Sequence, residues 1–451
     1  MSSCPNEGTS GPTVPPRAAG ICVGQTLLSS SSAYSIMQFI GEGYFGRVAR
    51  CVNRRTNETV AVKILKKDTN SDHNTENEVT ILKLISVLNP DQCNLVRFFE
   101  TFQHLGHKCL AFEMLELDLY HLILQMGNKP MLLLGIRPIA KQLLVALDAL
   151  KSLGVLHTDI KPDNIMIVNK REMRIKLIDF GLAVLASQVQ PGYIVQPMGY
   201  RAPEVSLGLP FTEAIDVWGV GCVLAFLYLA DNVFSVTCEY QMMRGIVELL
   251  GQPEDRLLLA GQYAERFFIQ EEAAEGKTWR LMTAEEYSFE NSTTVERWRS
   301  SFVQPKSLDG LVDMYAQKNA EHADRLAFVD LLKRLLRLDG DRRISASEAL
   351  QRPFITRSHL STECFTPSKL TSTCCSEENS DERLDTALGY EADQEGSDSV
   401  FEPIAYRPSM TPELSDPSNN LQERFHRFFR GIKNSLFCCV SPMVEYENSL
   451  S

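Results

Sequence analysis

The sequence feature that most constrains the fold is a change of hydrophobic pattern near Leu115. After this point apolar residues recur at steps of three and four, which predicts helices as far as about Phe354. Before it, short segments rich in β-branched and aromatic residues alternate with turn-prone polar stretches, a pattern typical of strands. These segments are SIMQFI (35–40), RVARCV (47–52), TVAVKIL (59–65) and KCLAFEML (108–115), with ENEVTILKLI (76–85) showing helical spacing between them. We therefore predict an α+β fold with a small β-rich lobe and a larger helical lobe.

Two short strands are expected within the helical part, IMIV (165–168) and IKLIDF (175–180). The apolar stretch 217–230 is shorter than the roughly 20 residues that a membrane span needs, so it predicts a buried core helix. Residues 1–33, rich in Ser, Pro and Gly, and the acidic residues 357–420 lack periodicity, and we expect both to be disordered.

Composition excludes some classes of function. The formal net charge is −12, but residues 361–420 hold 13 acidic against 3 basic residues, so the remainder is close to neutral. This argues against direct binding of nucleic acid, which requires a basic patch. The 12 cysteines form no Cys-x-x-Cys pair, and the N-terminus shows no secretory signal, so we expect reduced thiols in the nucleus or cytoplasm.

IGEGYFGRV (40–48) places three glycines in a G-x-G-x-x-G frame, which lets backbone N–H groups approach phosphate oxygens. Dinucleotide-binding folds use the same frame, but there the glycines open a helix. Here a strand pattern follows, so a hairpin over nucleotide phosphates is favoured over a simple structural turn. The candidate nucleotide-binding residues are Ile40, Gly41, Glu42, Gly43, Tyr44, Phe45, Gly46, Arg47 and Val48.

Lys63 lies within the apolar strand pattern of TVAVKIL, and a buried lysine must find an anion. Glu78, in the helical segment that follows, can supply it and leave Lys63 directed at the α- and β-phosphates. The alternative is a surface lysine whose stem lies on apolar neighbours, with an unrelated exposed glutamate.

LHTDIKPDN (156–164) and LIDFG (177–181) supply the groups that phosphoryl transfer requires. Asp159 can orient an attacking hydroxyl and accept its proton, and Lys161 can neutralise the γ-phosphate. Asn164 and Asp179 offer two oxygen ligands to Mg²⁺, which prefers few protein oxygens together with phosphate and water. A D-F-G tripeptide alone is weak evidence, but the ordered set is specific.

Taken together, these motifs resemble those of a eukaryotic protein kinase. The resemblance implies a two-lobed kinase domain over 34–356, with an N-lobe at 34–115, a C-lobe at 116–356 and an insert at about 252–325. It implies ATP and Mg²⁺ as cofactors. It further assigns adenine contacts to Glu113 and Leu115, an ion pair to Glu204 and Arg343, anchoring of the catalytic loop to Asp216, and an apolar stack to Leu82, Phe98, His157 and Phe180.

The chain is more specifically similar to the homeodomain-interacting protein kinases of the CMGC group, through FEMLELDLYHLI (112–123), YRAPEVSLGLPFTEAIDVW (200–218) and ADRLAFVDLLKRLL (323–336). This resemblance implies a monomeric serine/threonine kinase that acts on protein substrates, transcription factors or co-regulators among them, in signalling in the nucleus or cytoplasm. The alternative is a pseudokinase scaffold that binds partners, but it predicts erosion at Lys63, Asp159 or Asp179, and none is eroded.

Two positions depart from the common pattern. Thr158 stands where most kinases carry an arginine that binds a phosphate on the activation segment; its presence removes a switch but no catalytic group, so we predict an active loop. Met198 replaces an arginine that helps to favour proline after the target residue, which argues against assuming that preference here.

Tyr193 resembles the family's autophosphorylated tyrosine, although its spacing to Tyr200 is one residue longer; an ordinary loop tyrosine is the alternative.

Residues 421–440 form the last distinctive segment. LQERFHRFFRGIKNSLF predicts an amphipathic helix with apolar residues on one face and Arg424, Arg427, Arg430 and Lys433 on the other, followed by Cys438 and Cys439. Such a helix suits a membrane surface with palmitoylation as a second anchor. The alternative is docking on the kinase domain or on a partner.

Overall fold

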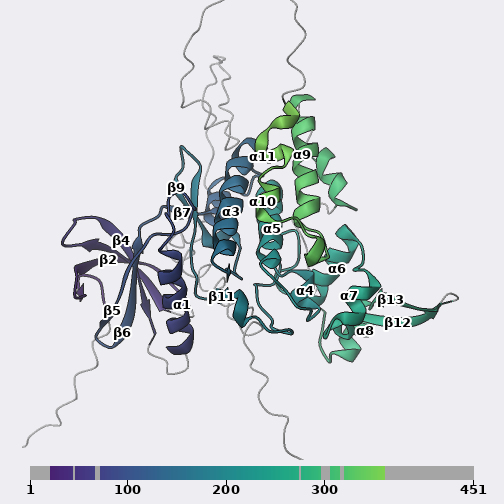
Figure 1. The fold of residues 1–451 in the computed structure, drawn as a ribbon, viewed down its shortest axis with the longest axis horizontal. Helices are drawn as coiled ribbons and strands as arrows, with labels where there is room; N and C mark the ends of the chain where they lie inside the picture. The colour runs from purple at the N-terminus through teal and green to yellow at the C-terminus, as the bar shows by residue number, and fades with distance from the viewer. Residues whose placement is uncertain are drawn as a thin grey trace, which may run out of the picture. The chain divides into compact units, whose positions relative to one another are not determined.

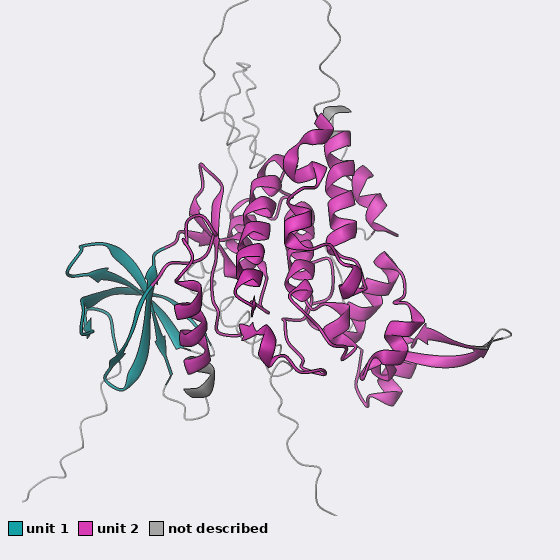
Figure 2. Cartoon of the chain, in the orientation of Figure 1, with its two compact units in different colours: residues 1–67, 99–114 teal, residues 68–98, 115–451 magenta. Residues whose placement is uncertain are grey.

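The computed structural model describes residues 21–43, 46–66, 72–273, 276–295, 305–314 and 319–360. Tyr44, Phe45, the predicted acidic tail (357–420) from residue 361 onward and the predicted helix at 421–440 lie outside the described residues. The first residues of the predicted tail are ordered, because Ser358–Leu360 form a short 3-10 helix. The chain divides into two compact units (Figure 2): unit 1 comprises Met1–Lys67 and Phe99–Met114, and unit 2 comprises Asp68–Phe98 and Leu115–Ser451. The predicted division near Leu115 coincides with the boundary after Met114, but residues 68–98, which include α1 (Asp72–Ile85) and were predicted within the N-lobe at 34–115, belong to unit 2.

Unit 1 is built on a curled, six-stranded sheet in the order β1-β2-β3-β4-β6-β5. Alternation along the strands buries one set of side chains, so that Ile36, Cys51, Val60 and Val62 form an apolar core with almost no exposed surface. The strands are β1 (Thr26–Leu28), β2 (Ala33–Glu42), β3 (Gly46–Asn53), β4 (Thr59–Leu65), β5 (Phe98–His104) and β6 (His107–Glu113).

Strand β1 corrects the prediction that residues 1–33 are disordered, for the described residues Thr26–Leu28. Thr26, Leu27 and Leu28 pair antiparallel with β2, and the Leu27 side chain is fully buried. A strand of three residues has no periodicity of its own, and it forms because β2 offers a free edge and a hydrophobic surface.

Unit 2 is mainly helical (Figure 1). Its central helix, α5 (Ala214–Leu229), is buried at every residue from Ile215 to Leu229 and packs against α3 and α9, which confirms the predicted core helix. The other α-helices described are α1 (Asp72–Ile85), α2 (Leu119–Gln125), α3 (Leu133–Ser152), α4 (Pro203–Ser206), α6 (Glu239–Leu250), α7 (Asp255–Ala260), α8 (Ala284–Glu290), α9 (Asn319–Leu335), α10 (Ala346–Ala349) and α11 (Pro353–Thr356). Of the helices that the structure describes, none is long and apolar enough to cross a membrane.

Small sheets in unit 2 frame the catalytic loop. One has the order β10-β9-β7, and in the other β11 pairs antiparallel with β8. The strands are β7 (Leu117–Asp118), β8 (Val155–Leu156), β9 (Ile165–Asn169), β10 (Arg174–Leu177) and β11 (Val184–Leu185). The strand predicted over 175–180 thus ends at Leu177.

The predicted insert at about 252–325 is folded where the structure describes it. It contains α7, α8 and the antiparallel hairpin of β12 (Phe268–Ala273) and β13 (Gly276–Leu281). Phe267, Phe268 and Tyr287 bury their side chains in a separate apolar cluster with Leu207 and Tyr240. Helix α9 already begins at Asn319, inside the predicted insert.

Candidate active site

The catalytic loop follows β8 and is held by one buried carboxylate. Asp216, in the first turn of α5, accepts hydrogen bonds from the backbone N–H groups of His157, at 2.6 Å, and Thr158, at 2.9 Å. Burial raises the pKa of Asp216, and the attraction of His157 and these two amide bonds oppose that shift. The predicted anchoring role of Asp216 is confirmed.

The three polar residues of the loop form one hydrogen-bonded cluster. Lys161 Nζ donates to both carboxylate oxygens of Asp159, at 2.9 and 2.8 Å. Asn164 Nδ2 donates to the Asp159 carboxylate at 2.6 Å and to its backbone carbonyl at 2.9 Å. The Asp159 side chain is 7% exposed, so its orientation is set by these partners and not by solvent.

The electrostatics of the cluster favour a charged lysine. Burial lowers the pKa of Lys161, but attraction to Asp159 and its hydrogen bond, with further attraction to Asp163 and Asp179, outweighs burial, so that the pKa is raised overall. Burial also raises the pKa of Asp163. Lys161 is therefore a fixed positive charge beside Asp159.

Asp179 is placed by a backbone change directly after β10. The Ile178 amide donates to the Asn164 carbonyl at 2.9 Å, and His157 Nε2 lies 2.9 Å from the Ile178 carbonyl. Asp179 itself has φ +59°, in the left-handed region, which ends the strand and turns its side chain from the strand direction. The next residue, Phe180, is buried with its ring edge-on to His157 at a centroid distance of 4.9 Å, as the predicted stack requires.

Asn164 and Asp179 suit a divalent cation by their chemistry. Because Asn164 uses Nδ2 for both bonds to Asp159, its amide oxygen, the atom that can ligate a cation, is not needed for those bonds. Asp179 is only half-buried. One amide oxygen and one carboxylate match the sparse protein ligation that Mg²⁺ accepts alongside nucleotide phosphates.

The activation segment contains contacts that sequence reasoning missed. Thr158 Oγ1 donates to the Leu182 carbonyl at 2.6 Å, and Asn77 Nδ2, in α1, donates to the Ala183 carbonyl at 2.8 Å. Neither contact has a signature in the sequence, because each depends on where the backbone of residues 182 and 183 lies. Met198 is buried and Tyr193 is 46% exposed, and autophosphorylation of Tyr193 stays a prediction.

Two buried arginines hold the far part of this segment. Arg201 donates to the Gln196 carbonyl and forms an ion pair with Glu239 at 3.0 Å, while Gln196 adopts φ +68°. Arg343 forms a bidentate ion pair with Glu204, at 2.6 and 2.8 Å, which confirms the predicted pair.

Unit 1 carries the predicted glycine loop and Lys63. The Gly43 amide donates to the Gly46 carbonyl at 2.8 Å, so the described ends of the loop form a hairpin between β2 and β3, as predicted. A Cβ on Gly46 would collide with the Ile64 carbonyl of β4, whereas one on Gly43 would meet nothing within 4 Å. Gly46 thus has a packing role, and Gly43 lines open space.

The remaining candidates are divided between the units. Lys63 lies in β4 and Glu113 at the end of β6, both in unit 1, whereas Glu78, 4% exposed in α1, and the buried Leu115 belong to unit 2. A pairing of Lys63 with Glu78 stays a prediction. The Arg47 guanidinium donates to the Ile21 carbonyl and lies 3.4 Å from the centre of the Phe39 ring, so its side chain is engaged within unit 1.

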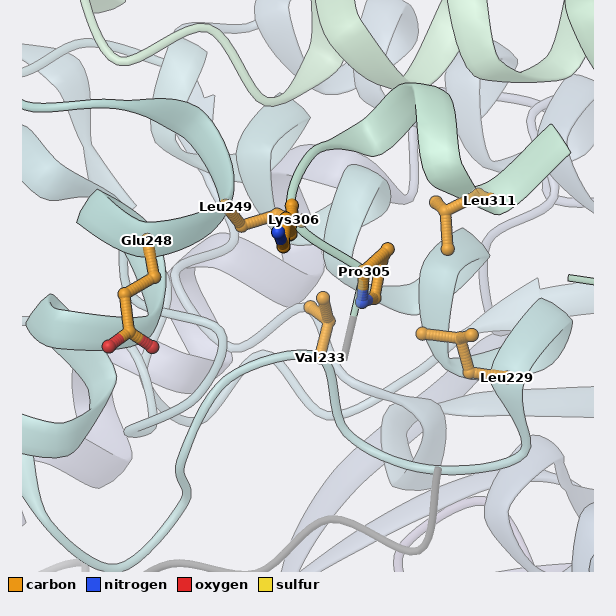
Figure 3. A pocket seen from close by; sticks show the side chains of 7 residues that line it. All are labelled: Leu229, Val233, Glu248, Leu249, Pro305, Lys306 and Leu311. Atoms are coloured by element: carbon orange, nitrogen blue, oxygen red, sulfur yellow. The ribbon is translucent and has the colours of Figure 1, made fainter. Parts of the chain in front are cut away.

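Figure 3 shows a separate cavity of about 300 Å³ in unit 2, lined by none of the predicted site residues. Mainly apolar side chains surround it, from the ends of α5 and α6, the loop after α5, and the segment 305–311. They are Leu229, Val233, Glu248, Leu249, Pro305, Lys306 and Leu311.

The catalytic-loop cluster, the D-F-G turn and the Glu204–Arg343 pair define a class of protein, and residues 34–355 match the family model of the protein kinase domain. The chain belongs to the protein kinase domain family. Its predicted resemblance is confirmed too: it is 41% identical over 349 residues to homeodomain-interacting protein kinase 1 of Mus musculus, covering 74% of this chain and 28% of that protein.

Two further relatives extend this comparison. Homeodomain-interacting protein kinase 4 of Rattus norvegicus is 36% identical over 354 residues, covering 74% of this chain and 57% of the relative. Serine/threonine-protein kinase ppk15 of Schizosaccharomyces pombe is 35% identical over 345 residues, covering 74% of this chain and 64% of the relative. The aligned part of the chain thus spans less than two thirds of each relative.

Proposed function

We propose that this chain is an active serine/threonine protein kinase that transfers the γ-phosphate of ATP to hydroxyl groups of protein substrates. The observation that carries the proposal is the Asp159 carboxylate, buried and held in one orientation by Lys161 and Asn164. Phosphoryl transfer depends mainly on alignment and charge neutralisation, and a preorganised carboxylate beside a fixed cation provides both.

In this proposal each residue of the cluster has one role. Asp159 orients the substrate hydroxyl and accepts its proton, while Lys161 places positive charge beside the transferring phosphate. Asn164 holds Asp159 and, with Asp179, would ligate Mg²⁺. Bound Mg²⁺ supplies charge neutralisation at the phosphate oxygens. From unit 1, Lys63 would contact the α- and β-phosphates and the glycine loop would cover the nucleotide.

The family resemblance suggests the finer assignments. The names of the relatives describe kinases that interact with homeodomain proteins, so we extend the proposal to transcription regulators as substrates, with signalling in the nucleus or cytoplasm. Autophosphorylation at Tyr193 and membrane attachment through residues 421–440 are separate proposals. Cell fractionation before and after mutation of Cys438 and Cys439 tests the last: fully soluble protein in both cases contradicts it.

The deciding experiment measures phosphate transfer from labelled ATP by the purified full-length chain, with phosphoamino-acid analysis. A fragment that starts at residue 30 would remove β1, so the full chain is required. Asp159→Asn should reduce transfer to serine and threonine by about 100-fold or more, because the proton acceptor is lost. If the wild type transfers no more phosphate than this variant while still binding Mg-ATP, the chain is a scaffold and the proposal is wrong.

A further inference from the structure

The start of the activation segment is fastened to its surroundings by uncharged groups. Leu182 and Ala183 give their consecutive carbonyls to the Thr158 hydroxyl and the Asn77 amide, respectively. Directly afterwards, β11 pairs with β8, and the Ala186 amide donates to the Gly154 carbonyl at 2.8 Å. Every one of these contacts joins groups that are neutral at all physiological pH values.

Thr158 has the most constrained position of this set. Its φ is +62°, in the left-handed region, which is strongly disfavoured for a β-branched residue. The side chain is 1% exposed, its amide is bound to Asp216, and its hydroxyl is bound to Leu182. One residue therefore joins the core helix α5, the catalytic loop and the activation segment.

The hydroxyl, and not the volume of the side chain, makes the connection. Valine has the same branched shape and would fill the same space, but it would leave the Leu182 carbonyl without this donor. A carbonyl in a partly buried setting needs a partner, and losing one favours conformations in which water supplies it. The bond from Thr158 to Leu182 thus helps to hold residues 182–186 in place only while residue 158 carries a hydroxyl.

The far part of the segment is held by a carboxylate that belongs to the protein. Arg201, 2% exposed, donates to the carbonyls of Val195 and Gln196 and pairs with Glu239, which also binds Arg266 at 2.8 Å. A buried arginine next to an activation segment is suited to a phosphate. Here a glutamate already neutralises part of its charge, which is consistent with a segment ordered by internal contacts at both ends.

We propose that Thr158 is a positioning residue that ties the start of the activation segment to the catalytic loop through its hydroxyl, so that this part of the segment is ordered without phosphorylation. The expected effect of Thr158 on catalytic activity rests on the proposed kinase function. Its structural part, the order of residues 182–186, is independent of catalysis and is measurable even in an inactive protein.

The test compares Thr158→Val, which removes only the hydroxyl, with Thr158→Ser, which keeps it. Thr356→Val is the matched control, because Thr356 also donates to a backbone carbonyl, at 3.2 Å, but is exposed and far along the chain in α11. Each full-length protein is treated with phosphatase and measured twice: for kcat and KM with a protein substrate, and for hydrogen exchange in peptides covering 180–188. Peptides from α5 report whether the core remains intact.

We expect phosphatase-treated wild type to keep its kcat. Thr158→Val should lower kcat about tenfold and raise exchange at 182–186, with α5 unchanged, since one partly buried carbonyl loses its donor. Thr158→Ser should restore both values toward wild type. Equal exchange in the valine variant and wild type would overturn the tether, and loss of wild-type activity on phosphatase treatment would overturn its independence of phosphate.

Failure of the kinase function has a different signature. If wild type and Asp159→Asn are equally inactive, the function proposed above is wrong, yet exchange at 182–186 still decides whether Thr158 holds the segment. If Thr158→Val does not fold, Thr158→Ala provides the same loss of hydroxyl with less strain at φ +62°, and the same exchange result is expected.

Discussion

Two carboxylates in unit 2, Asp216 and Glu204, are buried away from water, and the cost of burying each charge is offset by different partners. Asp216 is 2% exposed and accepts bonds from two backbone amides of the catalytic loop. Glu204 is 4% exposed and is neutralised by the guanidinium of Arg343 through two hydrogen bonds. One carboxylate therefore orients a loop with neutral donors, and the other joins two distant segments through opposite charges.

The contrast indicates what each site does for the protein. A buried ion pair gains little over an apolar pair of the same volume, but removal of one partner is costly because the other charge stays buried. Hydrogen bonds from neutral amides leave the carboxylate partly uncompensated, in line with the raised pKa of Asp216, but they set the direction of two consecutive peptide groups. Glu204–Arg343 is thus a clamp between two distant segments that is costly to break, whereas Asp216 sets the geometry of the catalytic loop.

The largest expected effect comes from breaking the clamp. Arg343→Met should lower the free energy of unfolding by about 3–5 kcal/mol, because Glu204 is left buried without its cation. Urea denaturation measures this change. Arg244→Met is the matched control: Arg244 is 47% exposed and pairs with the exposed Glu248, so its loss should cost less than about 1 kcal/mol. Similar values for the two variants would contradict the contrast.

An intermediate effect is expected from Asp216→Asn. An asparagine offers one acceptor where the carboxylate offered two, so one loop amide loses its partner, and kcat should fall by about 30-fold, equivalent to about 2 kcal/mol. The free energy of unfolding should change less than in Arg343→Met, because a buried charge is removed at the same time. A larger loss of stability than of activity would refute the assigned geometric role.

This variant also has a pH signature. Because burial raises the pKa of Asp216 in the folded protein, the folded state keeps its proton to a higher pH than the unfolded chain does. The stabilisation that arises from this raised pKa of Asp216 is therefore fully present below the unfolded pKa of about 4 and is lost as the pH rises through the folded pKa. The unfolding free energy of wild type minus that of Asp216→Asn should fall over this range; a constant difference would argue against the raised pKa.

The smallest effect is expected where an exposed carboxylate holds a buried cation. Lys176 is 1% exposed and binds Asp91, which is 46% exposed, at 2.7 Å; the hydrogen bond from Lys176 is the main cause of the lowered pKa of Asp91. Its contribution is present above the unfolded pKa of about 4 and is lost as the pH falls through the lowered folded pKa. An asparagine oxygen can still accept the hydrogen bond from Lys176 at this exposed position, so Lys176 keeps an acceptor. Asp91→Asn should therefore cost about 1 kcal/mol or less near neutral pH and still less in acid.

Urea titrations at several pH values test this expectation. Asp309→Asn is the control, because Asp309 is 67% exposed and its partner Lys333 is exposed as well. If the loss of unfolding free energy caused by Asp91→Asn grows as the pH falls, the predicted pH dependence has the wrong sign.

Local spacing made the centre of the site predictable. Asp159, Lys161 and Asn164 lie within one loop, so their order in the chain constrains their distances, and the structure brings them together. The pair of Glu204 and Arg343 lies 139 residues apart and was predictable only because the surrounding motifs resemble a known family. No local pattern in the sequence reports such a contact.

The features that were missed depend on the tertiary fold. Strand β1 forms only because β2 provides an edge, and the strand predicted over 175–180 ends early because Ile178 bonds to Asn164 and Asp179 turns into the left-handed region. The sequence shows that Thr158 cannot supply the positive charge of an arginine, but it does not show the bond to Leu182. That bond is made at a φ of +62°, which is improbable for threonine. Burial and strain at one residue are properties of the whole domain.

The position of Asp216 in α5 has a consequence for heat inactivation. That helix is buried along its whole length from Ile215, so the catalytic loop takes its direction from the part of unit 2 that is best shielded from water. Local opening is least frequent in such regions. Catalytic activity should therefore persist on heating until the core of unit 2 unfolds. The temperature at which turnover is lost should then coincide with the temperature at which this core unfolds.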